Sequence, residues 1–197
     1  MNVQPLERAQ ARRIAEIHAE ALKGDFLPSL GVRFLTELYR GMLDLGLGFG
    51  FVAVESGRVV GFVIASEDTS RLFRSVMLRR ALPLGWHILP ALVRRPALLG
   101  NVLQTLSYTR QEEAVTVTAE LLVIAVDPEQ RSHGLGAALC RALEQEFRRR
   151  GRGQYKVTVN QGYDGANRFY RRQGFALAHS FRLYGRLWNL YTRTLTS

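Results

Sequence analysis

The residues best suited to chemistry lie where an apolar run gives way to a polar, glycine-bearing turn. The run 121–126 contains β-branched residues and ends at Asp127-Pro128, and a helical pattern begins after the turn. The turn itself reads Arg131-Ser132-His133-Gly134-Leu135-Gly136. Such a strand–loop–helix junction presents free backbone N–H groups, and its glycines let oxygen atoms approach a backbone that has no Cβ. The stretch therefore predicts a site for a phosphate-bearing ligand.

A second stretch strengthens this interpretation and reads Ala166-Asn167-Arg168-Phe169-Tyr170-Arg171-Arg172-Gln173-Gly174-Phe175. The turn resembles the Gln/Arg-x-x-Gly-x-Gly/Ala signature for acetyl-coenzyme A in the GNAT family of N-acetyltransferases. The second stretch resembles that family's Ala-x-x-Phe-Tyr-x-x-x-Gly-Phe segment, in the right order and at a plausible separation. The resemblance covers residues 119–181 closely, the first 66 residues only in general pattern, and the middle of the chain not convincingly. It implies one N-acetyltransferase domain over residues 1–197, which moves an acetyl group from acetyl-coenzyme A to a primary amine.

The resemblance also assigns a site for the acetyl donor. The backbone of Ile124, Ala125 and Val126 would pair with the pantetheine arm as an added strand would, at a splayed end of the central strand. The pyrophosphate would be held by main-chain groups of Arg131, Ser132, His133, Gly134, Leu135, Gly136 and Ala137. Asn167 would either hydrogen-bond the coenzyme or cap the local turn. Many members place an asparagine seven residues before the tyrosine; Tyr163 stands there in this chain, and Asn160 is the substitute we consider.

Tyr170 is the residue that the resemblance implies as general acid. A phenol with an unperturbed pKa near ~10 keeps its proton at neutral pH and can donate it to a departing thiolate. The alternative is an aromatic side chain that packs beside Phe169.

Glu120, at the start of the central strand, is the candidate general base. Strict alternation would place it on one face with Leu122, Ile124 and Val126, where an apolar environment would raise its pKa. The alternative is a strand-end glutamate in solvent or paired with an arginine. We interpret His18, His87, His133 and His179 as core, surface or loop residues.

Cys140 is the single cysteine and is interpreted as buried packing, with no metal-ligand set around it. It also lies on the wrong side of the turn for a covalent acetyl-cysteine route. We therefore expect direct transfer in a ternary complex, with acetyl-coenzyme A as co-substrate and no metal.

These residues must be positioned by a mixed α/β fold, with a central sheet and helices on both faces. Helical patterns cover 6–22 and 26–44, a hairpin is predicted for 51–55 and 59–65, and the central strand for 119–126. Then follow a helix at 137–150, a strand at 154–160, a short helix through Arg172, and strands at 176–183 and 187–195. Residues 67–118 form a predicted helical insertion between the third and fourth strands.

The insertion has three interpretations. It can cover the substrate or mediate a homodimer; it can be a helical pair packed on the sheet, which we slightly favour; or it can rest on a membrane surface, which we rank last. Together with residues 26–44 it is expected to wall the acceptor site. We expect a small-molecule amine as acceptor, with a small preference for an amino sugar, while a protein amino group stays open.

Composition limits the other possibilities. The formal net charge is +10, and 25 of the 27 cations are arginines, which reflects either genome composition or attraction to an anionic ligand. We see no basic–aromatic interleaving of the kind that single-stranded nucleic acid prefers, so no nucleic-acid partner is expected. One cysteine, no apolar run of about 20 residues and no secretory pattern favour the cytoplasm. Two rivals stay open: a non-catalytic acyl-coenzyme A-binding module with a basic partner-binding insertion, and transfer of a longer acyl group.

Overall fold

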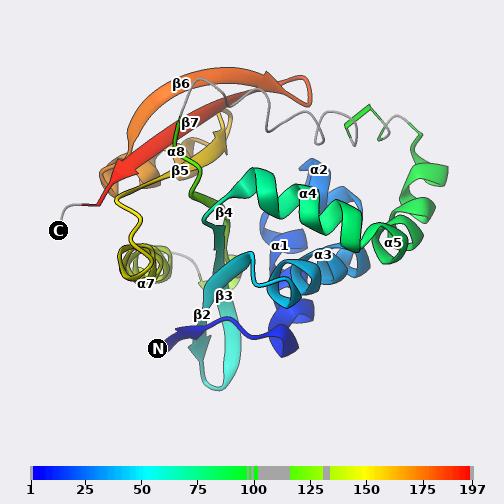
Figure 1. Cartoon of the computed structure of the whole chain (residues 1–197), viewed down its shortest axis with the longest axis horizontal. Helices are drawn as coiled ribbons and strands as arrows, with labels where there is room; N and C mark the ends of the chain where they lie inside the picture. The colour runs from blue at the N-terminus through cyan, green and yellow to red at the C-terminus, as the bar shows by residue number, and fades with distance from the viewer. Residues whose placement is uncertain (1, 97, 99, 102–115, 131–133, 196–197) are drawn as a thin grey trace.

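The computed structural model describes residues 2–96, 98, 100–101, 116–130 and 134–195. Its centre is a seven-stranded sheet in the order β1-β2-β3-β4-β5-β7-β6 (Figure 1). Neighbouring strands are antiparallel except β4 and β5, which are parallel and connected through a helix. The strands are β1 (Asn2–Pro5), β2 (Gly48–Glu55), β3 (Arg58–Ser66), β4 (Glu120–Val126), β5 (Gln154–Asn160), β6 (Ala176–Leu183) and β7 (Arg186–Thr194).

Helices cover both faces of this sheet (Figure 1). The helices are α1 (Ala11–Ala21), α2 (Phe26–Ser29), α3 (Val32–Asp44), α4 (Thr69–Arg79), α5 (Ala81–Arg94), α7 (Leu135–Arg149) and α8 (Asp164–Arg172), with short 3-10 turns at Arg8–Gln10 and Pro128–Gln130. This arrangement confirms the predicted mixed sheet with helices on both faces and a helical segment between the third and fourth strands. Among the described residues, no helix is both long and apolar enough to cross a bilayer.

Each face of the sheet has its own apolar core. On one face, α1 and α3 bury side chains such as Ile14 and Leu35 against Phe62 and Ile64 of β3. On the other face, α7 buries Leu139, Leu143 and Phe147 in a core that it shares with strands β2, β3, β4, β5 and β7. The apolar residues of α1 and α3 recur at helical spacing, so a single stripe of each helix meets the sheet.

Strand β4 is irregular at the point where it meets its neighbours. Its register with β3 slips between Ile64 and Ala65, so that Leu122 is an extra residue in β4. Toward β5, the strand pairs only at Glu120 with Lys156 and at Leu121 with Val157. Beyond these two pairs β4 and β5 diverge, and no strand of the described residues lies beside the remaining edge of β4 on that side.

The insertion extends the helical layer. The carboxylate of Asp68 caps α4 by accepting a hydrogen bond from the Arg71 amide. Helices α4 and α5 pack mainly on α3, with Leu72, Val76 and Leu84 buried in the shared core. The favoured interpretation was a helical pair packed on the sheet. The pair is present, but it packs on α3 rather than directly on the sheet, because α1 and α3 already cover that face. Residues 102–115 of the predicted insertion lie outside the described residues.

Candidate active site

A cavity of about 1120 Å³ opens where β4 and β5 diverge. We call the part lined by the start of α7 the α7 side, and the part lined by α1 to α3 and the β6–β7 hairpin the α2 side. Lining residues on the α7 side include Ile124, Ala125, Val126, Gly134, Leu135, Gly136, Ala137 and Phe169. Lining residues on the α2 side include His18, Asp25, Phe26, Tyr39, Tyr184 and Trp188. Glu120, Asn160, Tyr163 and Tyr170 also line the cavity, so it gathers residues from nearly the whole chain.

The backbone of residues 124–126 lies where β4 has diverged from β5, the part of the strand to which the family resemblance assigned the pantetheine arm. Val63, Phe62 and Gly61 of β3 pair with these residues on one side. On the other side, β5 has already left the ladder, so the backbone groups on that edge face the cavity. An extended chain carrying amide groups can pair with such an edge as an added strand does.

The start of α7 places its first amides beside this edge. Gly134 precedes the helix with a left-handed φ of 74°, and the first intrahelical bond runs from the Ala138 N–H to its carbonyl. The amides of residues 135–137 therefore have no partner within the helix, as expected of a helix N-terminus that can bind an anion. A Cβ on Gly136 would lie 3.4 Å from the Phe169 ring, so this glycine permits close packing of α7 on α8. Arg131, Ser132 and His133 of the predicted turn lie outside the described residues.

Tyr170 lines the cavity from α8 and is held by aromatic neighbours. Its ring packs edge-on against Phe169 and Phe175, with 5.2 Å between centroids in each case, and stacks on Tyr191 at 6.4 Å. Burial, with a smaller contribution from Cys140, raises the pKa of Tyr170 well above its usual range. The phenol therefore stays protonated at neutral pH and can act only as a proton donor there. The packing role and the donor role, which the sequence left as alternatives, are compatible in this geometry.

Glu120 is buried and lines the cavity, opposite Lys156 of β5 in the strand register. The prediction that it shares a face with Ile124 and Val126 is wrong. Because Leu122 is an extra residue in β4, alternation restarts after it, and Ile124 and Val126 pack with the core on the α7 face. Leu122 packs with the core on the opposite face. Strict alternation from a sequence has no means of anticipating such a bulge.

Asn160 and Asn167 organise the turn between β5 and α8. The Asn167 side-chain amide donates to the carbonyls of Asn160 and Tyr163, both at 2.9 Å, and its oxygen accepts from Asn189 and Tyr191. This geometry favours the turn-capping alternative for Asn167, whose side chain is fully engaged within the protein. The Asn160 side chain accepts a hydrogen bond from the Gly162 amide, and Asn160 still lines the cavity.

A buried histidine–tyrosine pair lines the α2 side and was not foreseen as part of a site. Nδ1 of His18 lies 2.7 Å from the hydroxyl of Tyr39. Burial lowers the pKa of His18 to about 4 and raises that of Tyr39. With both groups neutral, Tyr39 donates to Nδ1 when the imidazole proton is on Nε2, and Nδ1–H donates to the Tyr39 oxygen in the other tautomer. No local pattern in the sequence identifies this pair, because its members lie on different helices.

A polar and aromatic rim also closes the α2 side. The hydroxyl of Tyr163 donates to Asp25 at 2.6 Å, and Arg186 of the β6–β7 hairpin approaches the same carboxylate oxygen at 3.4 Å. Burial raises the pKa of Asp25, and these two partners oppose that rise. Above this group the Phe26 ring packs on Tyr184 with 5.0 Å between centroids, and Tyr184 packs edge-on to Trp188 at 6.4 Å.

Cys140 is buried in the α7-face core, and burial raises the pKa of its thiol to about 12. A thiol with this pKa is a poor nucleophile at neutral pH. Within the described ranges, no group of three or more histidine, cysteine, aspartate or glutamate side chains is arranged to hold a metal ion.

The fold is that of a mixed α/β protein with a cavity between two diverging parallel strands, and comparison with known families identifies its class. The family model "Acetyltransferase (GNAT) family" matches residues 13–175, so the chain belongs to the GNAT acetyltransferase family. The family's reaction, acyl transfer that depends on acetyl-coenzyme A, is the general activity of the chain.

Solved structures show the same fold at low sequence identity. A polyamine N-acetyltransferase from Drosophila melanogaster is 17% identical with a TM-score of 0.68, covering 98% of this chain and 100% of that one. A ribosomal-protein-alanine N-acetyltransferase from Brucella melitensis is 15% identical with a TM-score of 0.63, covering 99% and 100%. The PaiA N-acetyltransferase from Thermoplasma acidophilum, solved in complex with coenzyme A, is 13% identical with a TM-score of 0.60, covering 98% and 99%. No curated protein matches the chain in sequence.

Proposed function

We propose that this protein is an N-acetyltransferase that moves the acetyl group of acetyl-coenzyme A directly to the primary amine of a small molecule. The observation that carries the proposal is the divergence of β4 and β5 into a cavity of about 1120 Å³ that both Tyr170 and Glu120 line. One cavity thus offers an open strand edge, a helix N-terminus, a proton donor and a carboxylate. The proposal treats residues 1–197 as one catalytic domain.

The α7 side is proposed to bind the donor. The open edge of residues 124–126 pairs with the amides of the pantetheine arm, and the free amides of residues 135–137 bind the pyrophosphate. The cavity-lining part of Asn160 completes this side, whereas Asn167 supports it by holding the turn. The roles predicted for Arg131, Ser132 and His133 are kept as part of the same phosphate site.

Two side chains are proposed to move protons. The thioester is already activated, so the enzyme must place the amine, remove one of its protons and protonate the departing thiolate. Glu120 accepts the proton from the amine as the new C–N bond forms. Tyr170 donates a proton to the sulfur as the C–S bond breaks, which leaves free coenzyme A and the acetamide.

The α2 side is proposed to bind the acceptor. Its aromatic rim of Phe26, Tyr184 and Trp188 suits a ring or an apolar body, and Asp25 suits a cationic or hydroxyl-bearing group. An amino sugar combines these features and is the first acceptor to test. Residues 26–44, which the sequence suggested as part of the acceptor wall, contribute Phe26 to this rim. The β6–β7 hairpin contributes Tyr184 and Trp188, which the sequence did not indicate.

The decisive experiment measures coenzyme A release over a panel of amines, with Tyr170→Phe and Glu120→Gln beside the unmodified protein. Each variant is expected to lose a factor of roughly 10²–10⁴ in turnover, the usual contribution of a positioned acid or base, while its affinity for acetyl-coenzyme A persists. Tyr155→Phe is the matched control, because it removes a buried phenol hydroxyl outside the cavity lining. Unchanged turnover in Tyr170→Phe would remove that residue from its role. Failure of the unmodified protein to bind acetyl-coenzyme A would contradict the proposal as a whole.

A further inference from the structure

Helix α5 presents an apolar row to solvent that the proposed function does not use. Leu82, Trp86, Leu89 and Val93 recur at intervals of four, three and four residues, which places them on one face of the helix. Their exposed fractions are 87%, 76%, 54% and 75%, and Leu78 in the last turn of α4 is 76% exposed. These five side chains make up most of the large exposed apolar side chains in the described part of the chain.

Helix α5 has a packing partner, so the exposed row is not simply the surface of an unpacked helix. The other side of the helix is buried on α3, with Leu84 in the core and Ile88 and Ala91 packed against it. The helix is therefore apolar on both its inner and its outer face. Monomeric proteins rarely leave a contiguous apolar surface of this kind in water, and such surfaces usually mark a binding site for a protein or a membrane.

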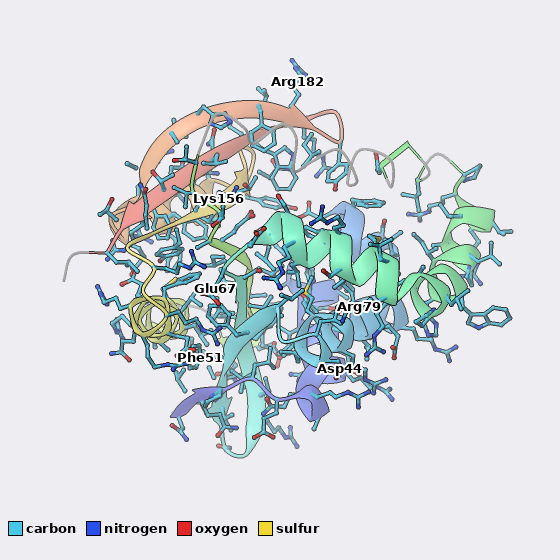
Figure 2. All side chains as sticks on the ribbon, viewed as in Figure 1. Asp44, Phe51, Glu67, Arg79, Lys156 and Arg182 are labelled. Carbon is cyan, nitrogen blue, oxygen red and sulfur yellow. The ribbon has the colours of Figure 1, made fainter. Side chains whose placement is uncertain are left out.

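The charged residues of this segment all have one sign. From Thr69 to Pro96 the chain carries six arginines and no carboxylate. The Arg80 side chain is paired with Asp44. The other five are exposed and form no ion pair with a described residue: Arg71, Arg74, Arg79, Arg94 and Arg95. Figure 2 shows Arg79 at the end of α4, beside α5. A helix segment with an apolar row flanked only by cations matches the requirements of an anionic lipid surface.

We propose that the outer face of α4 and α5 docks on the surface of a bilayer that contains anionic phospholipids. In this arrangement α5 lies in the plane of the interface, with its leucines, valine and Trp86 among the acyl chains and the arginines at the phosphates. Fourteen residues of helix extend about 21 Å, too short to cross the hydrocarbon core but suited to lying on it.

The unpaired arginines and the apolar row together favour an anionic bilayer over a second copy of the protein or a nucleic acid. A symmetric dimer through the same face would bring two sets of unpaired arginines together, which is unfavourable. A nucleic acid would satisfy the arginines but would leave the row of leucines and valine without an apolar partner. A bilayer with anionic headgroups satisfies both.

The test is co-sedimentation of the full chain, without acetyl-coenzyme A, with vesicles of phosphatidylcholine alone or with about one-third phosphatidylglycerol. Binding is expected to the anionic vesicles only and to weaken as salt rises. Leu82→Ser with Trp86→Ser should weaken partition at least tenfold, and Arg79→Gln with Arg94→Gln roughly fivefold for each arginine removed. Circular dichroism and the melting temperature confirm that each variant is folded.

Matched controls separate a docking face from a general effect of fewer apolar or charged residues. Leu177→Ser with Leu187→Ser removes two exposed leucines from the β6–β7 hairpin. Arg58→Gln with Arg182→Gln removes two exposed arginines, one at the start of β3 and one on β6, and Figure 2 shows Arg182 away from α5. Both controls should bind vesicles as the unmodified protein does. Equal losses in the controls, or no preference for anionic vesicles, would overturn the proposal. It would also be overturned by a lipid-free dimer that Leu82→Ser with Trp86→Ser abolishes, or by retention on duplex DNA without vesicle binding.

Discussion

Tyr163 donates a 2.6 Å hydrogen bond to Asp25, a residue 138 positions earlier in the chain. The bond joins the loop before α8 to the loop before α2, so it connects the two sides of the cavity at its rim. Position 163 is where many family members carry the asparagine discussed above. In this protein the position serves the rim on the α2 side instead.

Tyr163→Phe is therefore expected to affect the acceptor more than the donor. Loss of the hydrogen bond removes one of the two groups that lower the pKa of Asp25, so this pKa rises further. We expect KM for the amine to increase several-fold and the acidic limb of its kcat/KM profile to move to higher pH. Steady-state kinetics measures both, with the acetyl-coenzyme A Kd as the internal control. A weaker donor affinity with an unchanged amine KM would show that Tyr163 serves the α7 side after all.

His18 should make the stability of the protein depend on pH. Its folded-state pKa of about 4 lies below the unfolded value of 6.5, so the unfolded chain binds the extra proton more readily. The contribution of His18 is fully present above pH 6.5 and is lost as pH falls toward 4, by an amount on the order of 3 kcal/mol.

Urea unfolding between pH 4 and pH 7 measures this loss. His18→Gln should reduce the slope of stability against pH across that window, while His87→Gln, at a half-buried position in α5, is the control and should leave it unchanged. The same slope in both variants would mean that another group is responsible.

Asn167→Ala should destabilise the fold as well as the site. The side chain donates to a buried and a half-buried carbonyl and accepts from two buried donors, and a buried group left without its partner costs about 1–3 kcal/mol. We expect a loss of about 3 kcal/mol in the free energy of unfolding, measured by chemical denaturation. Asn2→Ala, on an exposed strand end, is the control. If Asn167→Ala kept full stability but lost coenzyme affinity, the coenzyme-binding alternative for Asn167 would be correct.

Gly134→Ala tests the turn before α7 through its backbone alone. No atom lies within 4 Å of a Cβ added there, so the only penalty is the left-handed φ of 74°, about 1–2 kcal/mol. A decrease of this size in unfolding free energy is expected, together with weaker acetyl-coenzyme A binding. Gly153→Ala, which has equal space and no positive φ, should be neutral. An unchanged midpoint for Gly134→Ala would show that the turn adapts without cost.

Local signals explain what the sequence could predict. The apolar period of 3.6 located α1 and α3, and alternation with turn residues located β2, β3, β5, β6 and β7 within a few positions. The glycine turn located the start of α7 because strand, turn and helix are contiguous there. Strand β1 was missed, since four residues ending in Pro5 carry too little pattern.

Long-range contacts explain what the sequence could not predict. The His18–Tyr39 pair and the Asp25–Tyr163 bond depend on how separate elements pack, and neither leaves a periodic trace in the chain. The bulge at Leu122 reverses the face of every later residue in β4, which no alternation rule anticipates. The proposed donor side of the cavity is therefore indicated by short motifs, whereas the residues of the proposed acceptor side come together only in the folded chain.

The two residue pairs that join β4 to β5 have a mechanical consequence. Strands β1 to β4 form one blade of the sheet and strands β5 to β7 form another, and the ladder that connects them is only Glu120 with Lys156 and Leu121 with Val157. The hydrogen-bond ladder is therefore incomplete in the interior of the sheet, between β4 and β5, and not only at its outer strands. A ligand that hydrogen-bonds beside this part of β4 would complete the ladder as a missing strand does. If acetyl-coenzyme A binds there as proposed, its binding is expected to connect the two parts of the sheet.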